Sequence, residues 1–227
     1  MPSAATLAAL LALCGCGDAG SGRGQLTVSA AASLKRAFTA YGGHFRAARV
    51  RFSFAGSDQL SAQIRQGAAP DVFAAANTKL PDSLHRTGLV DAPVVFAANR
   101  LVIAVPAGAS RIRSLADLAG RGVTIVAGSP SVPVGEYTRQ VLGRLPPVQR
   151  RAILANVRSE EPDVQGVVGK LTQGAADAGF VYATDVRAAA GRLRAIELAP
   201  ALRPRVAYAV ARVSRSGHRA QARAFIA

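Results

Sequence analysis

Short apolar segments alternate along this chain with longer segments of helical periodicity, and this alternation restricts the fold more than any other feature. Strand-like segments include LTVSAA at 26–31 and LVIAVP at 101–106. Between such segments apolar residues recur every three or four positions, as at Leu34, Ala37 and Phe38. Strands that alternate with helices of about 10 to 15 residues predict parallel sheets covered by helices. We therefore expect an α/β fold in which the sheets are mostly parallel.

Composition agrees with this fold class and argues against nucleic acid as a partner. Half of the 227 residues are hydrophobic, but only 5% are aromatic and none is Trp, so the core must consist mainly of small aliphatic side chains. The net charge is +15. The basic residues are scattered, without a basic run, an aromatic stacking platform or a nucleic-acid motif. A positive surface of this kind attracts small anions and anionic membranes.

The N-terminus has the pattern of a targeting segment. Residues 4–13 form an apolar run that is too short to cross a bilayer but fits a secretory signal. Cys16 follows Gly15 and resembles the lipidated cysteine of bacterial lipoproteins; an ordinary cleaved signal is the alternative. We expect residues 1–16 to be a signal or lipoprotein segment and 17–25 a flexible tether. The protein would then be extracytoplasmic, either anchored to the outer face of the cytoplasmic membrane through Cys16 or periplasmic.

The residues that usually hold metals or form disulfides are sparse. Both cysteines lie within the first 16 residues, and His44, His85 and His218 are far apart in sequence. We therefore expect no disulfide in the mature domain, no directly coordinated metal and no cofactor.

Four junctions between an apolar strand and a helix carry a residue that can begin a helix: Ser33, Ser57, Pro133 and Asp163. In a parallel sheet such junctions lie at the carboxyl ends of the strands, where ligands bind. A helix N-terminus there offers unpaired N–H groups and a positive dipole end, which suit an anion. Each serine taken alone is more simply a helix cap.

Taken in order, seven segments resemble the molybdate-binding protein family of ABC importers. The resemblance runs from Leu26 to the end of the chain. The segments are VSAAASL (28–34), SFAGSDQLSAQI (53–64), GAAPDVFAAA (67–76), NRLVIAVP (99–106), SVPVGEY (131–137), EPDVQGVV (161–168) and GFVYATD (179–185).

The resemblance implies a two-lobed class II periplasmic-binding-protein fold whose chain crosses between lobes near Ala104 and near Tyr208. Lobe 1 would comprise residues 26–103 plus 209–227, and lobe 2 residues 104–208. The protein would be a monomer that delivers molybdate or tungstate to the permease subunits of an ABC importer. It would not be an enzyme.

The resemblance also implies a set of residues that bind the oxyanion. Ser33 and Ser57 would each donate a hydroxyl and a backbone N–H, Val134 and Val164 a backbone N–H, and Tyr182 its phenol. Departures from the family pattern are Val134 in place of the common Ala, Asn77 in place of the common Asp, and a last helix that looks clipped.

A site built only of donors suits a fully deprotonated dianion, because an anion that keeps a proton would leave its O–H without an acceptor. Three alternatives remain open at this point. One is a binding protein for another oxyanion such as sulfate or phosphate. The second is the effector domain of a regulator. The third is a serine hydrolase using Ser33 or Ser57, although the chain has no G-x-S-x-G turn and no histidine near a serine in a suggestive arrangement.

Overall fold

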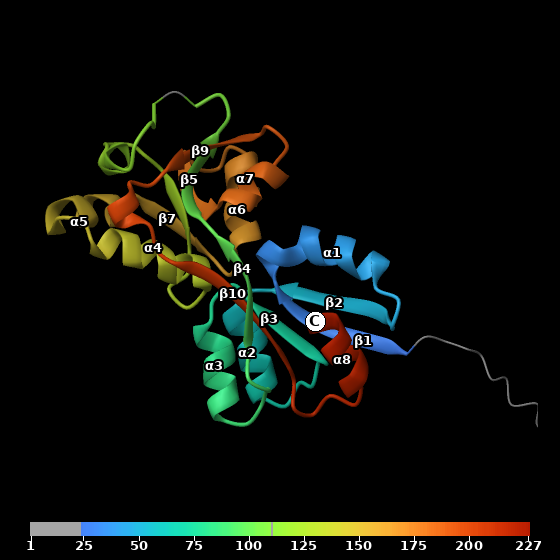
Figure 1. The fold of residues 1–227 in the computed structure, drawn as a ribbon. Helices are drawn as coiled ribbons and strands as arrows, with labels where there is room; N and C mark the ends of the chain where they lie inside the picture. Colours follow the sequence, from blue (N-terminus) through green and yellow to red (C-terminus); the bar gives the residue numbers. More distant parts are fainter. Residues whose placement is uncertain (1–23, 110) are drawn as a thin grey trace, which may run out of the picture.

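A computed structural model describes residues 24–109 and 111–227, which form two lobes (Figure 1). The expected signal segment 1–16, its Cys16 and most of the tether 17–25 lie outside the described residues. Gln25, expected in the tether, is already the first residue of a strand.

The first lobe is built on a five-stranded sheet of order β2-β1-β3-β10-β4. Its strands are β1 Gln25–Ala31, β2 Arg49–Ala55, β3 Val72–Ala75, β4 Val94–Asn99 and β10 Val206–Arg212. Its helices are the 3-10 turn η1 Ala32–Leu34 together with α1 Lys35–His44, α2 Ser57–Arg65, α3 Lys79–Arg86 and α8 Arg219–Ile226.

The central strand β3 shows how the sheet buries both of its faces. Successive side chains of a strand point to opposite faces. Val72 and Ala74 therefore belong to the core cluster that includes Phe225 of α8, while Phe73 belongs to a second cluster with Leu84 of α3. A strand with apolar residues at every position fits between two layers of helices.

The second lobe is built on a five-stranded sheet of order β7-β6-β8-β5-β9. Its strands are β5 Leu101–Pro106, β6 Ile125–Gly128, β7 Val157–Glu161, β8 Ala178–Tyr182 and β9 Leu193–Glu197. Its helices are α4 Pro133–Gly143, α5 Pro147–Ala155, α6 Val164–Thr172 and α7 Ala183–Ala188, with the 3-10 turns η2 Ala116–Ala119 and η3 Pro200–Leu202.

The two-lobed α/β architecture with mostly parallel sheets is confirmed, and in each sheet one strand runs against the other four. In the first sheet β1 is parallel to β2 and β3, whereas β10 is antiparallel to β3 and β4. In the second sheet β6 is parallel to β7 and β8, whereas β5 is antiparallel to β8 and β9. The route of the chain explains why β5 and β10 are antiparallel to their neighbours. β5 and β10 each enter their lobe from the other one, at the edge where the parallel strands end, and so run in the opposite direction.

The two crossings also differ slightly from the expected positions near Ala104 and Tyr208. β5 pairs with β8 from Leu101 onward, so the chain changes sheets at Arg100. β10 pairs with β4 from Val206 onward, so the return is complete before Tyr208. The lobe boundaries at 103/104 and 208/209 are corrected accordingly, because a strand pairs along its whole length within one sheet.

Candidate functional site

A small cavity of about 20 Å³ lies between the lobes, large enough for one or a few water-sized groups. All five residues expected to bind the oxyanion line it, together with their neighbours at the four strand-to-helix junctions. The lining residues are Ala31, Ala32, Ser33, Ala55, Gly56, Ser57, Ala76, Val132, Pro133, Val134, Asp163, Val164 and Tyr182. None of them is Lys or Arg, so inside the cavity an anion would be held by hydrogen bonds and helix dipoles.

The two serines of the first lobe have their oxygen atoms already engaged as acceptors. Ser57 begins α2, and its Oγ accepts the backbone N–H of Ala76 at 3.1 Å. Ser33 lies in η1, and its Oγ accepts the hydroxyl of Tyr208 at 3.1 Å. A serine hydroxyl has one proton to donate. Both serines therefore keep that proton for a group placed in the cavity.

The second lobe directs two helix N-termini at the cavity. Val134 is the second residue of α4, and Val164 is the first residue of α6. The first N–H groups of a helix have no partner inside it. The Asp163 carboxylate takes the N–H groups of Gln165 and Gly166 at 2.7 and 3.1 Å. Among the described residues no acceptor takes the N–H of Val134 or of Val164. Both remain available to an anion, and the positive ends of the two dipoles favour one.

The phenol of Tyr182 is a donor without an acceptor in the part of the chain that the structure describes. The residue ends β8, its side chain is 1% exposed, and its hydroxyl has no hydrogen-bond partner among the described residues. Leaving such a buried hydroxyl unpaired costs about 1–3 kcal/mol. Burial, reinforced by the neighbouring Tyr208 and Tyr137, raises the pKa of the phenol well above its usual value, so it remains protonated at neutral pH.

A buried carboxyl that the sequence reasoning missed lies directly behind Tyr182. Asp185 accepts the backbone N–H of Tyr182 at 3.0 Å and the side-chain amide of Gln165 at 3.1 Å. Burial raises the pKa of Asp185 to about 7, against the opposing effect of these two hydrogen bonds. The available signal was an acidic residue three positions after the residue that caps α7, which is half of a capping box.

The lobes touch around the cavity. The hydroxyl of Ser131 in the second lobe donates to Asp58 in the first at 2.6 Å. Lys79 and Glu136 form an ion pair of 2.8 Å across the same gap. A Cβ atom at Gly56 would lie only 2.4 Å from the carbonyl oxygen of Pro162. The structure is thus a closed arrangement in which a glycine permits the close approach of the two backbones.

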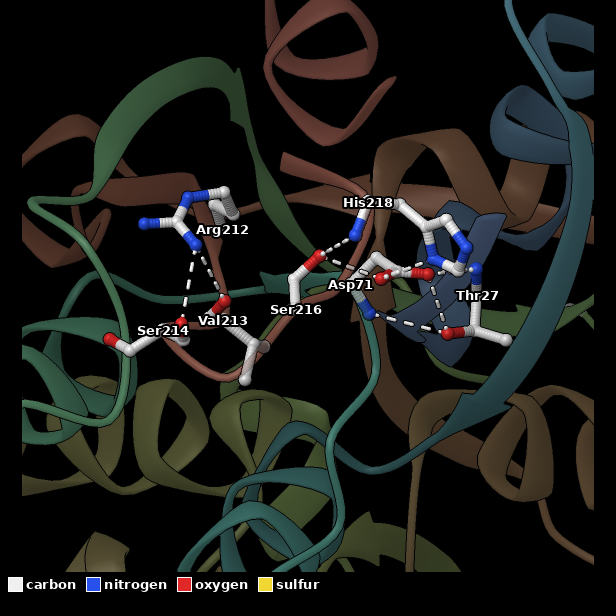
Figure 2. A network of polar contacts seen from close by, with 7 residues as sticks. All are labelled: Thr27, Asp71, Arg212, Val213, Ser214, Ser216 and His218. Atoms are coloured by element: carbon white, nitrogen blue, oxygen red, sulfur yellow. Dashed lines mark hydrogen bonds and ion pairs between the residues drawn. The ribbon is translucent and has the colours of Figure 1, made fainter. Parts of the chain in front are cut away.

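One group of Ser, His and Asp side chains does meet, but at the opposite end of the first sheet (Figure 2). Ser216 and His218 both contact Oδ1 of Asp71, at 2.7 and 3.1 Å, and Thr27 contacts Oδ2. The serine donates to the carboxylate rather than to the histidine, so the imidazole does not act as a base toward its hydroxyl. This cluster ties the segment before α8 to the starts of β1 and β3, which is a structural role.

Comparison with known proteins identifies relatives of the whole described domain. Residues 26–227 match the family model described as bacterial extracellular solute-binding protein. The molybdate-binding protein ModA of Mycobacterium tuberculosis is 40% identical over 212 residues, which are 91% of this chain and 79% of that protein.

Two solved structures have the same fold. The periplasmic molybdate-binding protein of Azotobacter vinelandii superposes with a TM-score of 0.78 at 23% identity, covering 88% of this chain and 90% of that one. The sulfate-binding protein SubI of M. tuberculosis superposes with a TM-score of 0.77 at 19% identity, covering 89% and 80%. Because one is named for molybdate and the other for sulfate, the fold alone does not select the anion.

Proposed function

This chain belongs to the bacterial extracellular solute-binding protein family, and on that premise we propose that it captures molybdate between its lobes and delivers it to the permease of an ABC importer. The relative at 40% identity, which is named for molybdate, supports this choice of anion. Tungstate has the same charge and nearly the same size, and we propose it as a second ligand.

The observation that carries the proposal is the convergence of unused donors on one cavity. We assign hydroxyl and backbone donors to Ser33 and Ser57, backbone donors to Val134 and Val164, and a phenol donor to Tyr182. The buried and unpaired hydroxyl of Tyr182 is the strongest single feature, because a protein gains nothing from it unless a ligand accepts its proton.

The chemistry of these donors favours a dianion that carries no proton. Hydrogenphosphate would place its O–H against another donor, and the lost hydrogen bond would cost a few kcal/mol. Sulfate has no proton, so its discrimination depends on the fit of a smaller anion in the cavity. Sulfate is accordingly the competitor that tests the assignment of molybdate most directly.

The two lobes provide the mechanism. Ser33 and Ser57 belong to the first lobe, and Val134, Val164 and Tyr182 to the second. An anion that bonds to both sets stabilises the closed arrangement, because in an open one it would keep only half of its contacts. The permease would recognise the closed form.

Several further features follow as proposals. The protein works as a monomeric binding protein rather than an enzyme, outside the cytoplasm, with a lipid on Cys16 holding it to the membrane. No helix of residues 24–109 or 111–227 combines the length and the apolar character needed to cross a bilayer.

Calorimetric titration of the purified protein with molybdate, tungstate, sulfate and phosphate tests the proposal. We expect one site for molybdate and tungstate, weak or absent binding of the other two, and loss of binding in Ser57→Ala. Tight binding of sulfate or phosphate with no response to molybdate would leave the family assignment intact and replace the ligand.

A further inference from the structure

Three residues from distant parts of the chain form a hydrogen-bonded relay that ends at the cavity. Asn99 ends β4, Tyr208 lies in β10 and Ser33 lies in η1. The Asn99 Nδ2 atom is 3.3 Å from the Tyr208 hydroxyl oxygen, which is 3.1 Å from the Oγ of Ser33. We call these residues the Asn99–Tyr208–Ser33 relay. Of the three, only Ser33 lines the cavity.

The orientation of the Asn99 amide is set by its surroundings. Its Oδ1 accepts the backbone N–H of Arg100 at 2.9 Å. The amide nitrogen therefore faces the other way, where it lies 2.8 Å from the hydroxyl of Thr184 as well as near Tyr208. Because an amide nitrogen only donates, both of these hydroxyl oxygens act as acceptors toward Asn99.

The direction of the next hydrogen bond follows from burial. Tyr208 is 2% exposed, and its oxygen already accepts from Asn99. If Ser33 donated to it as well, the phenol proton of Tyr208 would be buried without an acceptor, which is costly. The phenol proton therefore goes to Ser33. Burial also raises the pKa of Tyr208, so that proton is retained at neutral pH.

We propose that Tyr208 is a positioning and specificity residue, which fixes Ser33 as a donor toward the ligand and thereby favours oxyanions without a proton. The proposal rests on the proposed function of the cavity. Ser33 has one hydroxyl proton, and its oxygen accepts a hydrogen bond from Tyr208, so its own proton points to the ligand. Ser57 is held in the same state by the backbone N–H of Ala76. A side chain, that of Tyr208, orients the hydroxyl of Ser33, whereas a main-chain N–H orients the hydroxyl of Ser57. Only the orientation of Ser33 can therefore be changed by substituting its partner.

A double-mutant cycle on molybdate affinity tests the relay, using Tyr208→Phe, Ser33→Ala and the double variant. Loss of the phenol proton leaves Ser33 free to rotate, and we expect Tyr208→Phe to weaken molybdate binding about tenfold. Because Tyr208 acts through Ser33, the same change should have almost no effect in the Ser33→Ala protein. Tyr41→Phe is the matched control: it removes a tyrosine hydroxyl that is bonded to the Phe225 carbonyl, away from the cavity, on a residue that is 43% exposed, and molybdate affinity should not change.

Competition between sulfate and hydrogenphosphate gives a second readout. At about pH 8 both are dianions of similar size, and only the phosphate carries a proton. Each anion competes with molybdate and gives an inhibition constant. We expect Tyr208→Phe to lower the inhibition constant of phosphate relative to that of sulfate. Asn99→Asp should change this ratio further in the same direction. A carboxylate at position 99 would accept a hydrogen bond from the Tyr208 hydroxyl. Ser33 would then donate to Tyr208 and present a lone pair to the ligand. The added charge acts on both dianions and cancels in the ratio.

The outcomes separate the two proposals. Absence of molybdate binding in the unmodified protein would reject the proposed function. Molybdate binding with additive losses in the cycle, or with no effect of Tyr208→Phe, would reject the role of Tyr208 alone. An unchanged melting temperature in each variant identifies an effect on binding rather than on folding.

Discussion

The backbone N–H of Tyr182 donates to Oδ2 of Asp185 at 3.0 Å, which places a buried carboxyl directly behind the residue with the unpaired phenol. The same carboxyl accepts from Gln165, the neighbour of Val164 in α6. The cavity thus has a titratable group just behind its wall, although among the described residues only Asp163 and Tyr182 of the lining are ionisable.

Anion affinity should fall as pH rises through neutrality. Burial raises the pKa of Asp185 to about 7, so the carboxyl is mostly neutral at about pH 6 and mostly ionised at about pH 8. An ionised Asp185 repels a bound dianion, and we expect affinity for molybdate to drop about fivefold over this interval. Titration calorimetry in buffers with different ionisation enthalpies should also detect proton uptake on binding near pH 7.

Asp185→Asn provides the control, because an amide does not titrate and the pH dependence should flatten. Equal affinities of the unmodified protein at both pH values would exclude this effect. The free energy of unfolding should change with pH in the same direction as the affinity. Since the folded pKa is raised above the ordinary 3.8, the contribution of Asp185 is fully present below about pH 4 and is lost as pH rises through about 7.

Tyr182→Phe should move stability and affinity in opposite directions. The substitution removes a buried hydroxyl that has no partner among the described residues, so the unliganded protein should gain about 1 kcal/mol in free energy of unfolding. It also removes a donor to an anion, which should weaken molybdate binding by about ten- to hundredfold. Urea unfolding without ligand and calorimetry with molybdate measure the two effects. A less stable protein with unchanged affinity would show that the phenol serves packing only.

Gly56→Ala should prevent the lobes from closing. The new methyl group would lie 2.4 Å from the Pro162 carbonyl oxygen in the other lobe, and a backbone atom cannot be displaced cheaply. We expect at least about a tenfold loss of molybdate affinity. X-ray scattering with molybdate present should give a larger radius of gyration than for the unmodified protein.

Gly43→Ala is the matched control for this change. Gly43 lies in α1, where an added Cβ meets nothing within 4 Å. The alanine should preserve binding and slightly stabilise the helix, by up to about 1 kcal/mol. Full affinity in Gly56→Ala would contradict the closed arrangement as the binding state.

Asp71→Asn should destabilise the first lobe without affecting the cavity. Burial tends to raise the pKa of Asp71, but hydrogen bonds from Ser216, Thr27 and His218 outweigh it and lower the pKa (Figure 2). With a depressed folded pKa, the stabilisation is present above the ordinary value of 3.8 and is lost as pH falls through the folded pKa. We expect a loss of about 1–3 kcal/mol at neutral pH that shrinks toward about pH 3.

Urea unfolding at the two pH values measures this difference. Asp82→Asn, at a half-buried position of α3, serves as the control. A pH-independent loss in Asp71→Asn would mean that packing rather than the carboxylate charge matters at this position.

Local chemistry made much of this protein predictable from its sequence. The strand at 101–106 and the helices beginning at Pro133 and Val164 were identified from periodicity and from residues suited to helix starts. Strands with an irregular pattern were not identified. β7 reads VRSEE, which shows neither the alternation of a half-buried strand nor the apolar run of a buried one. β4 was missed as well: it reads VVFAAN, an apolar run, yet Val94, Val95 and Phe96 are exposed.

The residue types at the site were likewise determined locally, because a helix N-terminus and a serine beside it have the same chemistry in any fold. Only the tertiary structure decided how these groups are used. Tyr208 and Ser33 are 175 residues apart, and the direction of their hydrogen bond depends on Asn99 at the crossing between lobes. The pKa of Asp185 depends on burial beneath Tyr182. The direction of the hydrogen bond between Tyr208 and Ser33 and the desolvation of Asp185 both result from packing between segments that are distant in the sequence. The residue pattern within a single segment therefore cannot predict them.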